Sequence, residues 1–120
     1  MVYNLRMDIK IGSDILQLKK FQRAFKRCPE KFERDIFSEL ELQNSEISHL
    51  AGLFAAKEAV IKALDLKPGS WKLIEIRNIK SGKPVLNFND SLSKRDIKSC
   101  DLTISHHGDY VMAVVAILLK

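Results

Sequence analysis

Apolar and polar residues alternate strictly at the start of the chain, from Tyr3 to Ile11. A period of two is typical of a strand with one buried face, so we predict a strand here. The Gly12-Ser13-Asp14 segment breaks the alternation, and apolar residues then recur at helical spacing as far as Phe25. We therefore expect a first helix that is capped by Ser13 or Asp14 and ends before Pro29.

A longer helix, predicted over residues 47–64, is apolar nearly all the way round. Its large side chains form one stripe, and its glycine and alanines form the opposite face, which lets another backbone approach closely. Lys57 lies within the stripe, while Glu58 and Lys62 share one edge. A helix apolar on both faces should be buried, where an ion costs several kcal/mol unless it is paired or bound. An exposed i,i+4 pair between Glu58 and Lys62, with a snorkelling Lys57, is the alternative.

The remaining pattern predicts a mixed α/β domain. Ser38 and Glu41 have the spacing of a capping box, which indicates another short helix. Residues 73–79 and 85–88 are predicted strands joined by a turn at 81–84. Residues 102–106 and 110–119 form a predicted hairpin around 107–109. The last strand is almost uniformly apolar, so we expect it at the centre of the sheet or in an oligomer interface.

Length and composition favour an ordinary globular protein. The chain has 120 residues, of which 46% are hydrophobic, and we predict a single domain over residues 1–120. The start of the chain has no apolar signal core, and the longest apolar run, Val111 to Leu119, is too short to span a bilayer. Cys28 and Cys100 lack the spacing of metal ligands or of a disulfide framework. We therefore expect a cytoplasmic protein without a membrane partner or a zinc site.

Positive charge is concentrated on the first predicted helix. The formal net charge is +5, and the cluster consists of Lys19, Lys20, Arg23, Lys26, Arg27 and Lys31. This face is either simply solvated or a docking surface for an acidic partner. The cluster is not interleaved with exposed aromatic residues, and the chain contains no pattern of an RNA-binding or zinc-finger module. We therefore expect no nucleic-acid partner.

Two carboxylates are candidates for metal binding. Asp14 follows the first predicted strand and Glu58 lies in the long helix, and Mg²⁺ favours one or two carboxylates completed by water and substrate phosphates. For Asp14 a helix cap is the structural alternative. His106 and His107 are a poor metal pair, because successive side chains of a strand point to opposite faces.

In this order, these segments resemble those of the holo-acyl-carrier-protein synthases, the small 4′-phosphopantetheinyl transferases. The resemblance covers nearly the whole chain. Its strongest part is the central signature, Ala-Gly-Leu-Phe-Ala-Ala-Lys-Glu-Ala over residues 51–59, with Lys62 at the family's spacing. The supporting segments are Gly-Ser-Asp-Ile at 12–15, Phe-Ser-Glu-Leu-Glu-Leu at 37–42, Ile-Glu-Ile at 74–76, Gly-Lys-Pro at 82–84 and Thr-Ile-Ser-His at 103–106.

The resemblance implies an α+β fold with an antiparallel sheet packed on one long buried helix. It implies Mg²⁺-dependent transfer of 4′-phosphopantetheine from coenzyme A to a serine of an apo acyl carrier protein, leaving adenosine 3′,5′-bisphosphate. Asp14 and Glu58 would hold Mg²⁺, Lys62 would contact a phosphate, and Glu58 or a metal-bound water would take the serine proton. The implied donor-binding residues are Lys57, Lys62, Gly82, Lys83, Pro84 and His106, with a purely structural Lys57 as the alternative.

The resemblance also implies a homotrimer with sites between subunits, and an acidic carrier protein bound by Lys20, Arg23 and Arg27. Two departures concern the donor. Leu53 stands where the family usually has arginine, and the 65–71 loop lacks the family's glycine-rich stretch. A carrier-protein-binding relative with weak or altered donor use is therefore the alternative function. The presence together of Asp14, Glu58, Lys62 and His106 favours the enzyme, because a protein that only binds the carrier protein needs no metal ligands.

Overall fold

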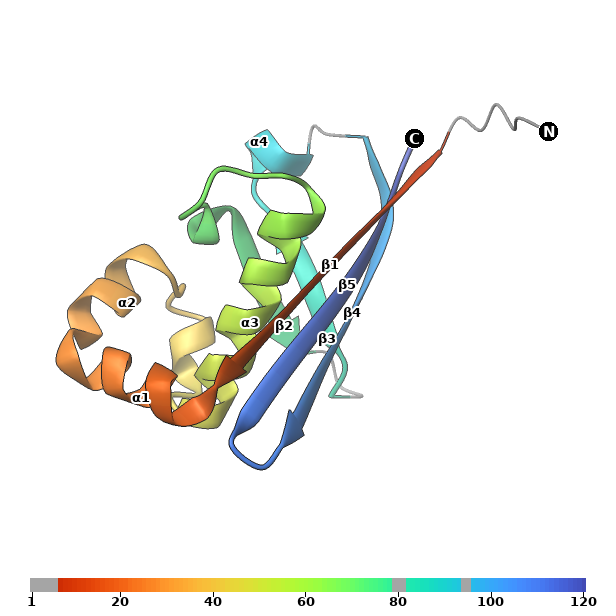
Figure 1. Ribbon diagram of the computed structural model, residues 1–120. Helices are drawn as coiled ribbons and strands as arrows, with labels where there is room; N and C mark the ends of the chain where they lie inside the picture. Colours follow the sequence, from red (N-terminus) through yellow and green to blue (C-terminus); the bar gives the residue numbers. More distant parts are fainter. Residues whose placement is uncertain (1–6, 79–81, 94–95) are drawn as a thin grey trace.

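The computed structural model describes residues 7–78, 82–93 and 96–120. Figure 1 shows a long helix, α3, with the strands along one side of it and the helices α1 and α2 on the other. In chain order the elements are β1 (Asp8–Gln17), α1 (Leu18–Arg27), α2 (Pro29–Asp35), η1 (Glu41–Gln43), α3 (Ile47–Ala63), η2 (Trp71–Leu73), β2 (Ile74–Asn78), β3 (Pro84–Phe88), α4 (Asp90–Ser93), β4 (Ile97–His107) and β5 (Tyr110–Leu119).

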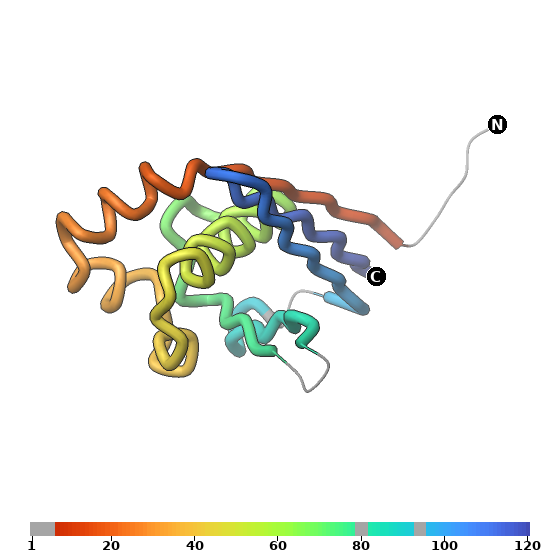
Figure 2. The backbone as a smooth tube through the Cα atoms, turned by 90° about the horizontal axis from the view of Figure 1, so that it is seen from below, coloured from red at the N-terminus to blue at the C-terminus, as the bar shows by residue number. Residues whose placement is uncertain are grey.

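The strands form two antiparallel sheets with α3 packed between them (Figure 2). One sheet has the order β1-β5-β4 and the other pairs β2 with β3. In β5 the alternate residues Val111, Ala113, Val115 and Ile117 are buried. The strand is therefore central, as its apolar sequence predicts, and the α+β fold with one long buried helix is confirmed.

The course of β1 differs from the prediction. The strand continues through Gly12, Ser13 and Asp14 and pairs with β5 from Asp8 opposite Leu119 to Gln17 opposite Tyr110. The predicted end of the strand at Gly12-Ser13-Asp14 is therefore wrong, because pairing with ten consecutive residues of β5 outweighs the local preference of this segment for a turn. Tyr3, at the predicted start of the strand, lies outside the described residues.

The N-terminus of α1 is also capped differently. Asp109, in the turn between β4 and β5, accepts the amide hydrogens of Leu18 at its main-chain oxygen (2.7 Å) and of Lys19 at Oδ1 (3.2 Å). Neither Ser13 nor Asp14 caps the helix, because both lie inside β1. A residue about ninety positions away in sequence supplies the cap.

Gly12 allows β1 to lie directly on α3. A Cβ atom at this position would collide with the main chain of Ala59 and lie 2.9 Å from the main-chain nitrogen of Ala63. The small residues of the helix therefore serve the close approach that the sequence predicts. This contact fixes the position of β1 relative to the C-terminal half of α3.

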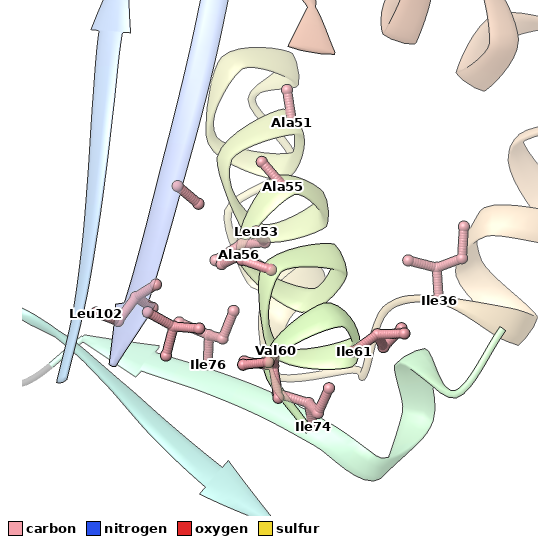
Figure 3. Close-up of a cluster of buried hydrophobic side chains, with 14 of the residues drawn as sticks. Ile36, Ala51, Leu53, Ala55, Ala56, Val60, Ile61, Ile74, Ile76 and Leu102 are labelled. Carbon is pink, nitrogen blue, oxygen red and sulfur yellow. The ribbon is translucent and has the colours of Figure 1, made fainter. Parts of the chain in front are cut away.

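The hydrophobic core surrounds α3 on both sides. In Figure 3 Ile74 and Ile76 of β2 lie near Val60 of the helix, and Leu102 belongs to β4 of the other sheet. Burying a side chain of this size stabilises a fold by about 1.5–3 kcal/mol. None of the helices in the described part of the chain is long and apolar enough to cross a membrane.

Lys57 lies inside this core. Its side chain is 1% exposed, and its Nζ donates to the Ile36 oxygen at 2.6 Å and to Glu41 Oε1 at 2.7 Å. Glu41 also accepts the amide hydrogens of Ser38 and, at Oε2, of Ile76. Burial lowers the pKa of Lys57, and the charge of Glu41 opposes that shift. The pair joins α3, the loop before it and β2.

The capping box at Ser38 is confirmed as part of this network. The Ser38 amide donates to Glu41 Oε1 at 2.9 Å, and the Glu41 amide donates to Ser38 Oγ at 3.2 Å. The carboxylate of Glu41 also pairs with the buried Lys57, which the capping-box spacing did not indicate.

Candidate active site

Asp14 and Lys62 meet where β1 crosses α3. Lys62 Nζ lies 2.9 Å from Asp14 Oδ1 and 3.0 Å from the Ser13 main-chain oxygen. The side chain of Asp14 is 18% exposed and that of Lys62 is 56% exposed. Because Asp14 is not a helix cap, its carboxylate is available to a cation, and the ammonium of Lys62 takes that place here. Lys62 thus pairs with Asp14 instead of forming the i,i+4 pair with Glu58.

Glu58 lies one helical turn before Lys62 on α3. Its Oε1 accepts a hydrogen bond from the indole nitrogen of Trp71 at 3.2 Å. A hollow of about 540 Å³ opens beside these side chains, between the end of α3 and the loop that follows. We call it the α3-end hollow, and it is lined by Glu58, Ile61, Lys62, Asp65, Leu66, Pro68, Gly69 and Trp71.

Four of the six predicted donor-binding residues gather in a second hollow of about 570 Å³, at the edge of β4. Gly82, Lys83, Pro84 and His106 all line this β4 hollow. His106 lies near Gly52 of α3, and the exposed His107 follows on the strand, where the alternation points it to the other face. Hydrogen bonding from Lys83, at 3.0 Å, lowers the pKa of Asp101 at the rim.

Two predicted donor-site positions are part of the core. Lys57 lines neither of the two hollows and is held by Ile36 and Glu41, which favours the structural alternative for this residue. Leu53 is 3% exposed and also contributes to the wall of the β4 hollow. The position that carries arginine in the family pattern is therefore an apolar wall here.

The structure thus divides the predicted site residues into two groups. Asp14 lies on β1 and His106 on β4, which are the two edge strands of the sheet, with β5 between them. At a strand spacing of about 4.8 Å their backbones are roughly 10 Å or more apart. The two hollows share no residue, and α3 contributes its first half to one and its second half to the other.

The basic residues predicted to bind a partner are exposed on α1. Lys20, Arg23 and Arg27 face solvent, while Phe21 is buried against Phe32 and Phe54, with ring centroids 5.6 Å and 5.7 Å apart. A third hollow, of about 530 Å³, adjoins this helix and combines apolar walls with Lys20. A charged surface with an apolar depression beside it has the character of a protein-docking surface.

The carboxylates of Asp14 and Glu58 are suited to Mg²⁺. Within residues 7–78, 82–93 and 96–120 no group of three or more histidine, cysteine or acidic side chains is arranged to hold a metal ion. Mg²⁺ does not require such a cage, since it commonly binds one or two carboxylates and completes its shell with water and substrate phosphates. The ammonium of Lys62 on Asp14 indicates that this carboxylate accepts a cation.

Residues 10–115 match the model of the 4′-phosphopantetheinyl transferase superfamily. The chain belongs to this superfamily of enzymes, which confirms the resemblance seen in the sequence. Its curated relatives include holo-acyl-carrier-protein synthases of Shouchella clausii, 39% identical over 92% of this chain and 98% of that protein, and of Thermodesulfovibrio yellowstonii, 36% identical over 89% and 96%.

Solved structures agree with this assignment. The holo-acyl-carrier-protein synthase of Helicobacter pylori in complex with coenzyme A has a TM-score of 0.82 and 31% identity, over 89% of this chain and 98% of that chain. The corresponding enzyme of Neisseria meningitidis has a TM-score of 0.80 and 32% identity, over 90% and 96%.

Two contacts in the site region have no signal of spacing in the sequence that predicts them. The partner of Lys57 is Glu41, and the partner of Glu58 is Trp71. A lone tryptophan in a polar loop was the available signal for the second contact, but its direction depends on how the loop folds back on α3.

Proposed function

We propose that this protein transfers 4′-phosphopantetheine from coenzyme A to a serine hydroxyl of an apo acyl carrier protein. Its relatives are named holo-acyl-carrier-protein synthases, and a similar structure is a complex with coenzyme A. The observation that carries the proposal is the contact of Lys62 with Asp14, because it brings a carboxylate of β1 to the helix α3, on which Glu58 lies one turn before Lys62. Glu58 and Lys62 both line the α3-end hollow.

In this reaction the serine oxygen forms a bond to the phosphorus that bears pantetheine. The bond from that phosphorus to the bridging oxygen of the pyrophosphate breaks, and adenosine 3′,5′-bisphosphate leaves with the electron pair. The serine proton passes to a base, which is Glu58 or a water molecule beside it. Lys62 can turn from Asp14 to a phosphate oxygen, because more than half of its side chain is exposed.

We propose Asp14 and Glu58 as the residues that hold Mg²⁺. When bound, the ion neutralises the charge that develops on the pyrophosphate oxygens. The protein's own contribution is to fix both carboxylates on rigid elements, one in β1 and the other in α3. Gly12 makes this possible, because it brings the strand into direct contact with the helix.

The β4 hollow is our proposed site for the nucleotide end of coenzyme A. Lys83 and His106 can donate hydrogen bonds to phosphate oxygens, and Gly82 and Pro84 shape the wall beside them. Leu53 removes one expected cation from this wall and favours the second candidate, a carrier-binding protein with weak or altered use of the donor.

We propose a homotrimer in which one copy's α3-end hollow faces another copy's β4 hollow. The division of the predicted residues between opposite edges of the sheet supports this arrangement. The sheet face opposite α3 supports it too, because Ile9, Ile11 and Ile15 are 64–69% exposed and Met112 is 42% exposed. Apolar side chains in this number on one face indicate an interface between copies.

The native mass in solution should therefore be that of an oligomer, with a trimer as the expected state. Replacing Ile11 with glutamate should dissociate it, since three copies of a buried charge would lack partners. Light scattering after size-exclusion chromatography measures the mass, and Lys10→Glu on the same strand is the control. A strictly monomeric protein with full activity would contradict the shared site.

Docking of an acidic carrier protein should depend on α1. Arg23→Glu should raise KM for the carrier by roughly tenfold or more and weaken its dependence on salt, because a like charge then faces the partner. KM for coenzyme A should stay nearly unchanged. Lys98→Glu is the matched control, because Lys98 lies at the start of β4, at the opposite end of the sheet from the junction of β1 with α1. An unchanged carrier KM would show that the basic face is only solvated.

Mass spectrometry tests the function itself. An apo carrier protein incubated with this protein, coenzyme A and Mg²⁺ should gain the mass of one phosphopantetheine group. Binding of the carrier without any mass gain would favour the second candidate. The same assay without Mg²⁺, in the presence of a chelator, should give no product. We place the reaction in the cytoplasm, in keeping with the two free cysteines, Cys28 and Cys100.

A further inference from the structure

Trp71 is the only tryptophan of the sequence and contacts a proposed metal ligand. Its indole nitrogen donates a hydrogen bond to Glu58 Oε1 at 3.2 Å. The residue opens η2, thirteen positions after Glu58, and lies on the wall of the α3-end hollow together with Glu58 and Lys62.

A ring contact restricts the indole of Trp71, and a tight turn restricts the chain just before it. Its ring centroid lies 6.0 Å from that of Phe54, a residue one turn before Glu58 on α3. In the turn that precedes Trp71 along the chain, the Ser70 amide and hydroxyl both donate to the Lys67 oxygen, at 3.2 Å and 2.6 Å. Trp71 is partly buried, so its ring has limited freedom to turn away.

The hydrogen bond makes the two oxygens of the Glu58 carboxylate inequivalent. Oε1 accepts the indole N–H, and within the described parts of the chain Oε2 has no hydrogen-bond partner. A glutamate side chain loses substantial rotamer freedom when it is fixed, and a donor that fixes it in advance lowers this cost for any ligand. Outer hydrogen bonds to metal-binding carboxylates typically change metal affinity by about 10–100-fold.

We propose that Trp71 is a positioning residue that orients the Glu58 carboxylate toward the divalent cation it shares with Asp14. The inference rests on the proposed function, in which these two carboxylates hold the metal. It assigns no chemical step to the indole, which acts only through Glu58.

The test measures metal binding directly with Mn²⁺ as the probe. Trp71→Phe keeps an aromatic ring against Phe54 and removes the N–H donor. Electron paramagnetic resonance of the free ion measures Mn²⁺ binding in the presence of adenosine 3′,5′-bisphosphate. In the Trp71→Phe protein the affinity for Mn²⁺ should fall by about 10–100-fold. The matched control is Phe54→Leu, which disturbs the ring contact, keeps the donor and should change the affinity much less.

A second replacement avoids any change of shape. Benzothienylalanine at position 71 substitutes sulfur for the indole N–H in a ring of nearly the same size, and a single tryptophan makes this replacement specific. It should weaken Mn²⁺ binding as Trp71→Phe does, without lowering the melting temperature. In a Glu58→Gln background Trp71→Phe should have no further effect on Mn²⁺ binding, whereas a purely structural role would act in both backgrounds.

Each outcome decides the inference. Unchanged Mn²⁺ affinity in the benzothienylalanine protein would overturn it, and so would an unaltered protein that binds no Mn²⁺. The transfer assay with the unaltered protein tests the proposed function separately. Normal transfer together with unchanged Mn²⁺ binding in both Trp71 variants would reject the positioning role and leave the function intact.

Discussion

Asp14→Asn and Glu58→Gln should each lower kcat for phosphopantetheine transfer by roughly a hundredfold or more. Either change removes one carboxylate charge from the pair that we propose as the Mg²⁺ site. The double variant should lose little more than either single variant, because two ligands of one ion act as a unit. Steady-state kinetics at several Mg²⁺ concentrations measures the effect, and excess Mg²⁺ should rescue the single variants only in part.

The fold should tolerate both substitutions. The pair of Asp14 with Lys62 is partly exposed, with side-chain exposures of 18% and 56%, so its loss should cost less than about 1 kcal/mol of stability. Asp8→Asn, on the same strand and exposed to solvent, is the matched control and should keep normal kinetics. Near-normal activity of Asp14→Asn or Glu58→Gln in Mg²⁺ would contradict the metal assignment.

Lys57→Met should give the largest loss of stability, about 3–5 kcal/mol. The substitution leaves the buried carboxylate of Glu41, whose side chain is 0% exposed, without its counter-ion. Two amide donors, from Ser38 and Ile76, remain on that carboxylate, so the fold should persist at low temperature. Chemical denaturation monitored by circular dichroism gives the free energy of unfolding.

A second substitution separates charge from packing. Combining Lys57→Met with Glu41→Gln removes both ions and should recover much of the lost stability, because no unpaired charge stays buried. Arg34→Met breaks a surface pair with Asp35 and should barely change the melting curve. If Lys57→Met alone were as mild as Arg34→Met, the buried pair would not be an important part of the fold.

The different environments of Lys57 and Lys62 were only partly predictable from the sequence. Both lysines lie in α3, and the helical periodicity of the sequence places Lys57 inside the apolar stripe and Lys62 at the edge of the helix that carries Glu58. That phase relation correctly indicates a buried ion and an accessible ion. Their partners come from elsewhere, since Glu41 and Asp14 lie 16 and 48 positions away along the chain.

Hydrophobic periodicity by itself determined the long helix α3, the central strand β5 and the hairpin of β4 and β5. The spacing of two polar residues, Ser38 and Glu41, determined the capping box. Each depends on side chains a few positions apart, so the local pattern contains the needed physics. The resemblance to the family predicts Asp14, Glu58 and Lys62 as a set, and the structure brings Asp14 and Lys62 into contact. The opposite faces of His106 and His107 also follow from the period of a strand.

Only the tertiary structure decided the path of β1, the cap of α1 and the partners of Lys57, Lys62 and Glu58. A Gly-Ser-Asp segment favours a turn locally, yet here it is extended because β5 offers a hydrogen-bonding partner along its whole length. Asp109 and Trp71 reach Lys19 and Glu58 because the chain folds back on itself, and no local preference encodes such a meeting. The residue types of the site are therefore a property of the sequence, whereas their pairing is a consequence of long-range packing.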